Sequence, residues 1–377
     1  MEKPVILQVV AALDQGGVEQ GTLDMARYTV QQGWTSLVAS AGGRLVMDLE
    51  RAGAQHFRLP LQQRNPVAIL YNALRLASLV RRHGVDLMHT RSRAPAWATR
   101  IASRLTGVPY ITSFHGTHRI QNRLKWRYNN VMTSGLLTIA NSRFIRQHIR
   151  QHYGLAEDRL RLAQRGIDTT VFDPDKLDAE DLAELRSRWQ LDGSPLILMP
   201  GRLTRWKGQA VFIAALDRIR DLPWQALIAG GADRKDKYAA ELRALAAGCG
   251  LQERVRFTGS LDNLARLYAL ADITVSASTE PEAFGRVAVE SQAMGTPVIV
   301  TAHGGSMETV RDGETGLLAE PGSVDSLAVC LRELLADPAR RKLMGEAGRA
   351  HVLAHFTVER MCEQEFSVYR EILGAAG

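Results

Sequence analysis

Two carboxylates flank a glycine at a point where a helix is expected to begin. In STEPEAFGRVAVESQAMG, residues 278–295, Glu282 precedes Phe284 and Gly285, and Glu290 follows on the expected helix. Glycine permits the turn, and the free amides of a helix N-terminus bind phosphate. The amides of Phe284 and Gly285 are therefore expected to face a phosphate. Because carboxylates accept hydrogen bonds from hydroxyls, Glu282 is expected to hold a transferred sugar and Glu290 a ribose diol.

Two cations follow an apolar strand in MPGRLTRWKGQA, residues 199–210. Arg202 and Lys207 come after the expected strand end and before the next helix. Ligands of parallel α/β sheets bind at this edge, where Arg grips phosphate oxygens bidentately and Lys neutralises them. We favour a phosphate-binding site over two exposed loop cations.

A glycine pair turns the chain from strand to helix in DQGGVEQGTLDMA, residues 14–26. Gly16 and Gly17 would let the backbone approach an anion closely. The segment lacks the GxGxxG pattern with a distal acid that marks a dinucleotide site. A tight turn without a ligand explains the pair equally well.

A histidine and a basic, aromatic tail follow another expected strand in residues 112–132. His115 stands at the strand end, where a side chain would face a ligand cleft. The tail suits a membrane interface or an anionic acceptor, and a solvated helix face is an equal alternative. Its candidate residues are Arg119, Arg123, Lys125, Trp126 and Arg127.

Short apolar runs alternate with amphipathic stretches along the chain, which predicts a doubly wound α/β fold with parallel strands. Residues 171–195 are acidic and Pro-flanked, and we expect a linker there before a second α/β unit restarts at Leu196. The chain is expected to be helical after the last strand. The strands are expected at 5–10, 35–39, 87–89, 110–114, 136–140, 196–200, 225–229, 255–258, 273–277 and 297–301.

Charge is distributed unevenly over the 377 residues. Residues 1–175 carry 23 Lys and Arg against 12 Asp and Glu, a net charge of +11, whereas residues 176–377 carry 24 against 28, a net of −4. A basic half is typical of proteins that meet nucleic acid, anionic membranes or anionic substrates, although scattered charges are usually only solvated. Three widely spaced cysteines and the lack of a signal peptide or a run of transmembrane length favour a cytoplasmic location.

Several of these segments together resemble the retaining GT-B glycosyltransferases of the large family 4 type, also called group 1 glycosyltransferases. The resemblance is carried by the E-A-F-G-x-x-x-x-E element from Glu282 to Glu290, by AMGTPVIVTAHGGSMETVRDGETGLL after it, and by GRLTRWKG at 201–208. GGVEQ, FHG, ANS and RGIDTTVFDP occur in the family's usual order, so the resemblance covers essentially the whole chain.

The resemblance implies two tandem Rossmann-like domains that face a central cleft. We expect an acceptor-side domain at 1–172, a nucleotide-sugar domain at 173–355, and a C-terminal helix at 356–377 that crosses back to the first domain. The implied activity moves a sugar from a nucleotide-diphosphate donor to a glycan or glycolipid acceptor with retention of anomeric configuration. MHTRSRAPAWATR, residues 88–100, resembles bacterial members that build lipopolysaccharide or other surface glycans. The basic first half and the Arg, Trp and Tyr residues of 119–128 add the expectation of peripheral contact with the anionic inner membrane.

The resemblance also implies roles for individual residues. Arg202 and Lys207 would contact the donor diphosphate and share catalysis with His115 and Glu282, and Gly16 and Gly17 would border the cleft. The other donor-binding residues would be Glu282, Phe284, Gly285 and Glu290. No metal or other cofactor is expected, and the D-x-D at residues 173–175 is interpreted as a turn.

Two other classes of protein remain as alternatives. The basic half would suit a non-catalytic nucleotide- or nucleic-acid-binding protein, but no stacking platform or recognition module accompanies the arginines, so we expect no nucleic-acid partner. A GT-B epimerase or phosphorylase would share the fold. The sequence does not name the base, the sugar or the acceptor.

Overall fold

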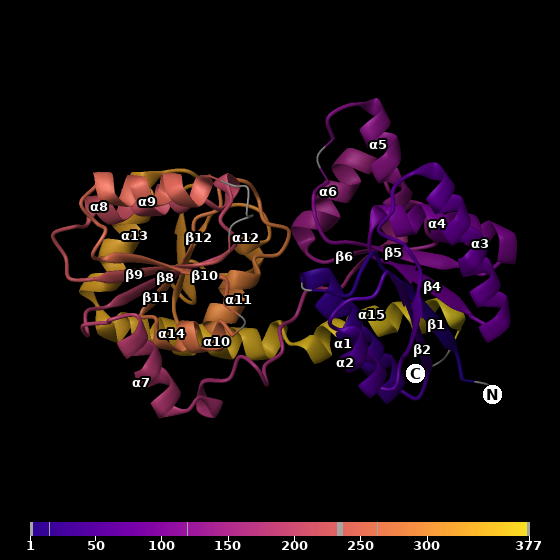
Figure 1. The fold of residues 1–377 in the computed structure, drawn as a ribbon, viewed down its shortest axis with the longest axis horizontal. Coiled ribbons are helices and arrows are strands. Elements are labelled where there is room, and N and C mark those ends of the chain that lie inside the picture. Colours follow the sequence, from indigo (N-terminus) through magenta and orange to yellow (C-terminus); the bar gives the residue numbers. More distant parts are fainter. Residues whose placement is uncertain (1–2, 15, 119, 232–236, 262, 375–377) are drawn as a thin grey trace. The chain divides into compact units, whose positions relative to one another are not determined.

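The chain folds into two compact units, shown in the computed structural model of Figure 1. The structure describes residues 3–14, 16–118, 120–231, 237–261 and 263–374. One unit comprises Met1–Arg165 with Val358–Gly377, and the other comprises Gly166–Thr357. The first unit therefore ends earlier than the boundary expected at 172. The amide of Ile167 bonds to the carbonyl of Phe356, and its buried side chain packs in the second unit.

A parallel sheet forms the centre of the first unit. Its described strands follow the order β3-β2-β1-β4-β5-β6-β7, and β1 lies between β2 and β4, with Val9 opposite both Ala39 and Thr90. Because the central strands are buried on both faces, they read as continuous apolar runs. The strands are β1 (Val5–Val9), β2 (Thr35–Ser40), β3 (Gln55–Arg58), β4 (Leu87–Thr90), β5 (Tyr110–Phe114), β6 (Thr138–Ala140) and β7 (Leu160–Leu162).

Helices cover both faces of this sheet. Apolar residues of α3 (Pro66–His83) and α4 (Arg93–Thr106) pack on one face, and those of α1 (Gly17–Gln31) and α15 (Val358–Leu373) pack on the other. The remaining described helices of the unit are α2 (Val46–Arg51), α5 (Arg123–Asn129) and α6 (Arg143–Tyr153), with 3-10 turns η1 (Asn130–Thr133) and η2 (Glu157–Arg159).

The C-terminal helix α15 is held in the first unit by buried polar contacts as well as by apolar packing. The guanidinium of Arg91 donates to both carboxylate oxygens of Glu365, at 3.0 and 2.6 Å, and also to Gln8. His89 bonds to the hydroxyls of Tyr369 and Ser113 through its two ring nitrogens. These specific pairs fix the register of a helix that is distant from the sheet in sequence.

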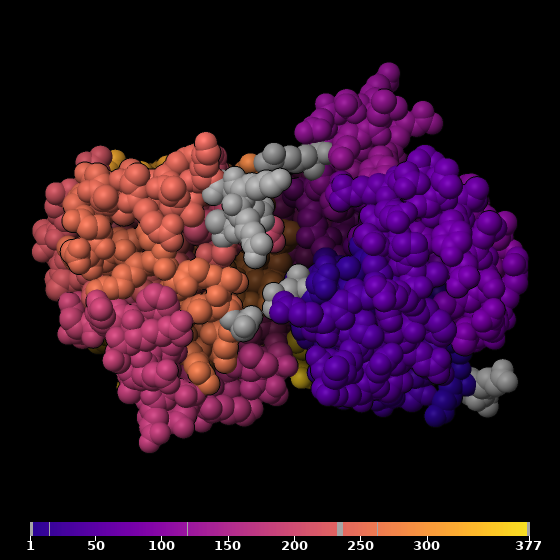
Figure 2. Space-filling view, viewed as in Figure 1, coloured from indigo at the N-terminus to yellow at the C-terminus, as the bar shows by residue number. Residues whose placement is uncertain are grey.

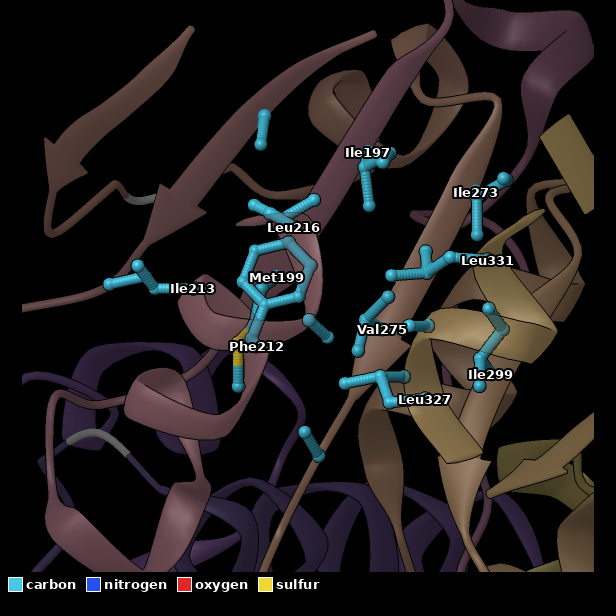
Figure 3. Packing of buried hydrophobic residues seen from close by; sticks show 14 of the residues in the cluster. Ile197, Met199, Phe212, Ile213, Leu216, Ile273, Val275, Ile299, Leu327 and Leu331 are labelled. Atoms are coloured by element: carbon cyan, nitrogen blue, oxygen red, sulfur yellow. The ribbon is translucent and has the colours of Figure 1, made fainter. Parts of the chain in front are cut away.

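The second unit contains another parallel sheet, with the order β10-β9-β8-β11-β12-β13 among its described strands. Side chains of β8, β11 and β12 interlock with those of α8 and α13 on one face, as Figure 3 shows for Ile197, Phe212, Val275, Ile299 and Leu331. The strands are β8 (Leu196–Pro200), β9 (Gln225–Ala229), β10 (Val255–Gly259), β11 (Ile273–Ser276), β12 (Val298–Thr301) and β13 (Gly316–Ala319). The helices are α7 (Ala179–Arg188), α8 (Gln209–Arg218), α9 (Tyr238–Gly248), α10 (Ala265–Leu270), α11 (Arg286–Ala293), α12 (Ser306–Thr309), α13 (Val324–Ala336) and α14 (Pro338–His355), with turns η3 (Pro174–Lys176) and η4 (Arg205–Lys207).

Two expectations about the elements were wrong. Residues 171–195 are not a linker that precedes the second unit, because they lie within it: η3 and α7 form there, and Leu182 and Leu185 pack against the core beside β8 and β9. The chain also returns to the sheet as β13 after the last expected strand. The edge strands β3, β7 and β13 have only three or four residues each, and β3 and β7 are partly polar, which explains why periodicity did not predict them.

Candidate functional site

An ion pair lies at the carboxyl edge of the second sheet. The ammonium of Lys207 donates to Glu282 Oε1 at 2.7 Å, and the hydroxyl of Ser278 donates to the same oxygen at 2.6 Å. Gly208 makes this approach possible, because its φ is +77° and a Cβ there would lie 1.8 Å from the carbonyl oxygen of Ala277. The end of η4 is thereby held against the chain that leaves β11.

The Glu282 carboxylate is ionised at neutral pH. Burial raises its pKa, but the charge and hydrogen bond of Lys207 and the Ser278 hydroxyl outweigh burial and leave the pKa below its ordinary value. An ammonium has three N–H donors, so Lys207 can bind Glu282 and still donate to a ligand. Lys207, which is expected to contact a phosphate, is thus adjacent to Glu282, which is expected to contact the sugar attached to that phosphate.

The start of α11 is shaped by close backbone packing. Gly285 caps the helix with a φ of +86°, and a Cβ there would lie 2.9 Å from the hydroxyl of Ser306. The amide of Gly305 bonds to the carbonyl of Glu282 at 2.8 Å, which joins the two loops. The Phe284 side chain is buried and packs edge-on against Phe356, so only its backbone is available for a ligand.

Glu290 lies on α11 with partners from two elements. The buried hydroxyl of Tyr268 on α10 donates to its Oε2 at 2.9 Å, and Arg286 pairs with its Oε1 at 2.7 Å. Burial and the Glu290 charge raise the pKa of Tyr268 well above its ordinary value, so Tyr268 remains a donor. The two contacts fix the orientation of the carboxylate, and its remaining lone pairs can accept from ribose hydroxyls.

A pocket of about 430 Å³ opens at the ends of β8, β9 and β10. Arg202 is exposed and contributes to its wall. Most of the other residues that line the pocket have small side chains, so their backbone atoms are accessible to a ligand. These residues are Gly201, Ala229, Gly230, Gly231, Ser260, Leu261 and Leu264. Its position at the carboxyl ends of parallel strands is where doubly wound folds bind nucleotides.

His115 follows β5 in the first unit and is electrically neutral at neutral pH. Burial lowers the pKa of its imidazole well below the ordinary value, and the charges of Arg165 and Arg91 lower it further. Its Nε2 is enclosed and has no hydrogen-bond partner within the part of the chain that the structure describes. A neutral imidazole with one uncommitted nitrogen can accept or donate a single hydrogen bond.

Gly16 and Gly17 stand at the start of α1, as expected for a strand-to-helix turn. Glu19 occupies the first turn of the helix, and its Oε2 lies 2.4 Å from where a Cβ at Gly16 would be. An acid at this helix start makes it less favourable for an anion than the start of α11. The role of the glycine pair beside a donor stays a prediction.

The basic tail of the first unit forms α5, which Figure 2 shows within a projection from that unit. Arg123 and Arg127 are exposed, and Leu124 between them is 78% exposed. Trp126 is held by the fold, since its indole donates to the carbonyl of His152 at 2.9 Å. Lys125 contributes to a pocket described below, and Arg119 lies outside the described residues.

The D-x-D segment and the arginines of residues 88–100 have structural partners. Asp173 accepts from Arg349 at 2.9 Å and caps η3, and its pKa is held below the ordinary value by these contacts despite some desolvation. Arg91 is committed to Glu365, and Arg93 donates to Asn129. Within the described residues, no group of three or more His, Cys, Asp or Glu side chains is placed to hold a metal.

Three residues of the second unit join the site without having been predicted. Ser276 and Ser278, two positions apart at the end of β11, both donate to Glu282. Their spacing on one side of an extended chain was a usable signal. Tyr268 gave no signal, because a buried tyrosine on a short helix is indistinguishable from a core residue in sequence.

Comparisons with known proteins define the class. Residues 182–351 match the family profile described as glycosyl transferases group 1, and residues 15–171 match that of glycosyltransferase family 4. A GDP-mannose-dependent alpha-(1-6)-phosphatidylinositol monomannoside mannosyltransferase of Mycobacterium tuberculosis is 32% identical over 303 residues, which are 75% of each chain. The chain belongs to the group 1 glycosyltransferases of the family 4 type.

Solved structures agree with this assignment. A glycosyltransferase from Rickettsia africae superposes with a TM-score of 0.92 at 36% identity and full coverage of both chains. The Anabaena protein Alr3699/HepE, in complex with UDP and glucose, superposes with a TM-score of 0.85 at 25% identity, covering 98% of this chain and 100% of that one. The two Rossmann-like units are those of the GT-B fold. Among the described helices, none has both the length and the apolar character to cross a bilayer.

Proposed function

We propose that this glycosyltransferase moves a sugar from a nucleotide-diphosphate donor to a glycan or glycolipid acceptor, with retention of anomeric configuration and without a metal. The observation that carries the proposal is the Lys207–Glu282 ion pair beside the start of α11. The cation and the helix amides lie together with a carboxylate. The first two would bind a phosphate, and the carboxylate would accept hydrogen bonds from the hydroxyls of an attached sugar.

The second unit would hold the donor. Arg202 and Lys207 would neutralise the diphosphate, Glu282 would accept from hydroxyls of the donor sugar, and Glu290 would accept from the ribose. The mycobacterial relative is named for GDP-mannose, and the Anabaena structure contains UDP and glucose. Both support a nucleoside diphosphate sugar for this chain and leave the base open.

The chemistry we propose is a front-face displacement. The bond between the anomeric carbon and the phosphate oxygen breaks, the acceptor oxygen bonds to the same face, and the acceptor proton passes to the departing phosphate. Arg202, Lys207 and the amides at Phe284 and Gly285 would stabilise the charge on that phosphate. Glu282 is already hydrogen-bonded three times, which favours a binding role over a nucleophilic one. His115 would hydrogen-bond the transferred sugar through its neutral imidazole.

The acceptor side is proposed to include peripheral contact with an anionic membrane, in the synthesis of lipopolysaccharide or another bacterial surface glycan. Support comes from α5, where the exposed Leu124 lies between exposed arginines. The relative's name, which specifies a phosphatidylinositol monomannoside acceptor, supports a lipid-linked acceptor here.

The proposal is tested by incubating the protein with UDP-, GDP- and ADP-sugars and a panel of glycolipid acceptors. We expect one donor to release its nucleotide diphosphate only when an acceptor is present. Release with water or inorganic phosphate instead would indicate a hydrolase or phosphorylase, and donor conversion without release would indicate an epimerase.

A further inference from the structure

We infer that a cationic pocket on the first unit binds a phosphate group of the acceptor. The inference rests on the proposed function, because it assigns a chemical feature to the acceptor. The pocket has a volume of about 380 Å³. It is lined by Arg64, Arg93, Gln121, Asn122, Leu124, Lys125 and Tyr128.

The position of the pocket in the fold favours a ligand site. Arg64 lies between β3 and α3, Arg93 is the first residue of α4 just after β4, and Lys125 lies on α5 after β5. The three strands are parallel, so the segments that follow them emerge at the same edge of the sheet. His115 follows β5 at this edge, where doubly wound sheets bind ligands.

The described residues give the charges in the pocket no counter-charge. No carboxylate among them lines the pocket, and none of its three cations forms an ion pair with any of their carboxylates. The Arg93 guanidinium and the Lys125 ammonium lie 5.9 and 5.8 Å from the centre of the Tyr128 ring. Two like charges held against one ring repel each other, and a bound anion relieves that repulsion.

Another basic hollow of the same unit provides the contrast. Arg143, Arg146 and Arg150 on α6 line it, together with Glu157, which pairs with Arg146 and Arg150. This hollow therefore contains a carboxylate that pairs with two of its arginines, whereas no described carboxylate lines the first pocket. Arg150 is a matched control for Arg64, since both are exposed arginines at the rim of a hollow in this unit.

Phosphate suits the donors that the pocket offers. Guanidinium groups bind phosphate oxygens bidentately, and the ammonium adds a point charge. Leu124 lies exposed at the rim, so a phosphate with an apolar substituent would also find a contact. The phosphate can belong to a soluble phosphorylated sugar or to a lipid headgroup.

The experiment titrates glycerol 3-phosphate into the full chain by calorimetry. Arg64→Gln and Arg93→Gln should each weaken binding roughly tenfold or more, while Arg150→Gln leaves it unchanged. Lys207→Met should also leave it unchanged, which separates this pocket from the donor site. Arg64 is exposed, so its substitution keeps the fold even if Arg93→Gln disturbs the contact to Asn129.

A second arm identifies the source of the phosphate. The protein is sedimented with phosphatidylcholine vesicles that contain or lack phosphatidic acid. If binding to the vesicles with phosphatidic acid requires Arg64, the phosphate belongs to a lipid. A soluble source follows if glycerol 3-phosphate binds through Arg64 and the vesicles do not. Equal affinity of wild type, Arg64→Gln and Arg93→Gln for glycerol 3-phosphate, or an equal loss in Arg150→Gln, overturns the inference.

The outcome is separable from that of the proposed function. If no nucleotide sugar is turned over and glycerol 3-phosphate still binds through Arg64, the proposed function fails and the pocket stands. If transfer proceeds and Arg64→Gln binds glycerol 3-phosphate as wild type does, the pocket assignment fails and the function stands.

Discussion

Replacing Lys207 by methionine separates its role in ligand binding from its role in folding. The change keeps the length of the side chain and removes the ammonium that lies 2.7 Å from Glu282. A charge-assisted contact to phosphate contributes about 1.5–3 kcal/mol. Lys207→Met should therefore weaken nucleotide diphosphate binding roughly 10- to 100-fold, as measured by calorimetry.

The same substitution leaves Glu282 as a nearly buried carboxylate without its cation. Breaking a fully buried pair costs about 3–5 kcal/mol. Here the two side chains are 16% and 11% exposed, and Ser276 and Ser278 still donate to the carboxylate, so we expect a smaller loss of about 1–3 kcal/mol in unfolding free energy. The double variant Lys207→Met/Glu282→Gln should recover much of this stability without recovering affinity.

The pH dependence of unfolding gives an independent readout of this pair. The folded state lowers the pKa of Glu282 below 4.5, so its contribution to stability is complete above that pH and is lost as pH falls through the lowered pKa. Lys207→Met removes the largest contributions that lower this pKa, so the folded and unfolded pKa values of Glu282 move together and less stability should be lost as pH falls. The neighbouring Arg205 is exposed and paired with Glu241, and Arg205→Met should leave nucleotide affinity unchanged. Unchanged affinity in Lys207→Met, or restored affinity in the double variant, would refute the ligand role.

Four further outcomes are expected. His115→Ala should lower kcat with donor binding largely preserved, and full turnover would remove it from the mechanism. Glu290→Gln should weaken nucleotide binding, as measured by calorimetry. Tyr268→Phe should weaken it less, because the contact of Glu290 to Arg286 remains. Equal affinities of Glu290→Gln and wild type would contradict the ribose role. Glu365→Ala should lower the unfolding free energy in denaturant titrations by about 3–5 kcal/mol, because it strands the buried Arg91 charge, whereas an exposed ion pair would cost under about 1 kcal/mol. Binding to anionic vesicles should weaken as salt shortens the screening length to about 3 Å at 1 M, and equal partition onto neutral vesicles would count against electrostatic docking.

The central strands and the segments that follow them could be predicted because their signals are local. A strand that is buried on both faces appears in the sequence as a continuous apolar run. In such sheets the residues that bind a ligand come directly after the end of a strand. That reasoning singled out Arg202, Lys207 and His115 as candidates, and the structure places each of them after the end of a strand. The edge strands were missed because a partly exposed run such as that of Gln55–Arg58 has no such pattern.

Long-range pairing accounts for what the sequence did not reveal. The contact between Lys207 and Glu282 joins residues from two different crossovers, and Tyr268 reaches Glu290 from a third element. Arg91 is buried and pairs with Glu365, which is 274 positions away along the chain. Because nothing near Arg91 in the sequence indicates this partner, composition counts Arg91 with the other basic residues of the first half. Composition counts charges without showing which of them the fold neutralises.

The anomeric configuration of the first-formed product tests the account most directly. Proton NMR of a reaction with a donor of defined α configuration should show an α-linked product, formed in equal amount to the nucleotide diphosphate released. Lys207→Met should slow both together. A β-linked product, or nucleotide release without glycosylated acceptor, would contradict retaining transfer at this site.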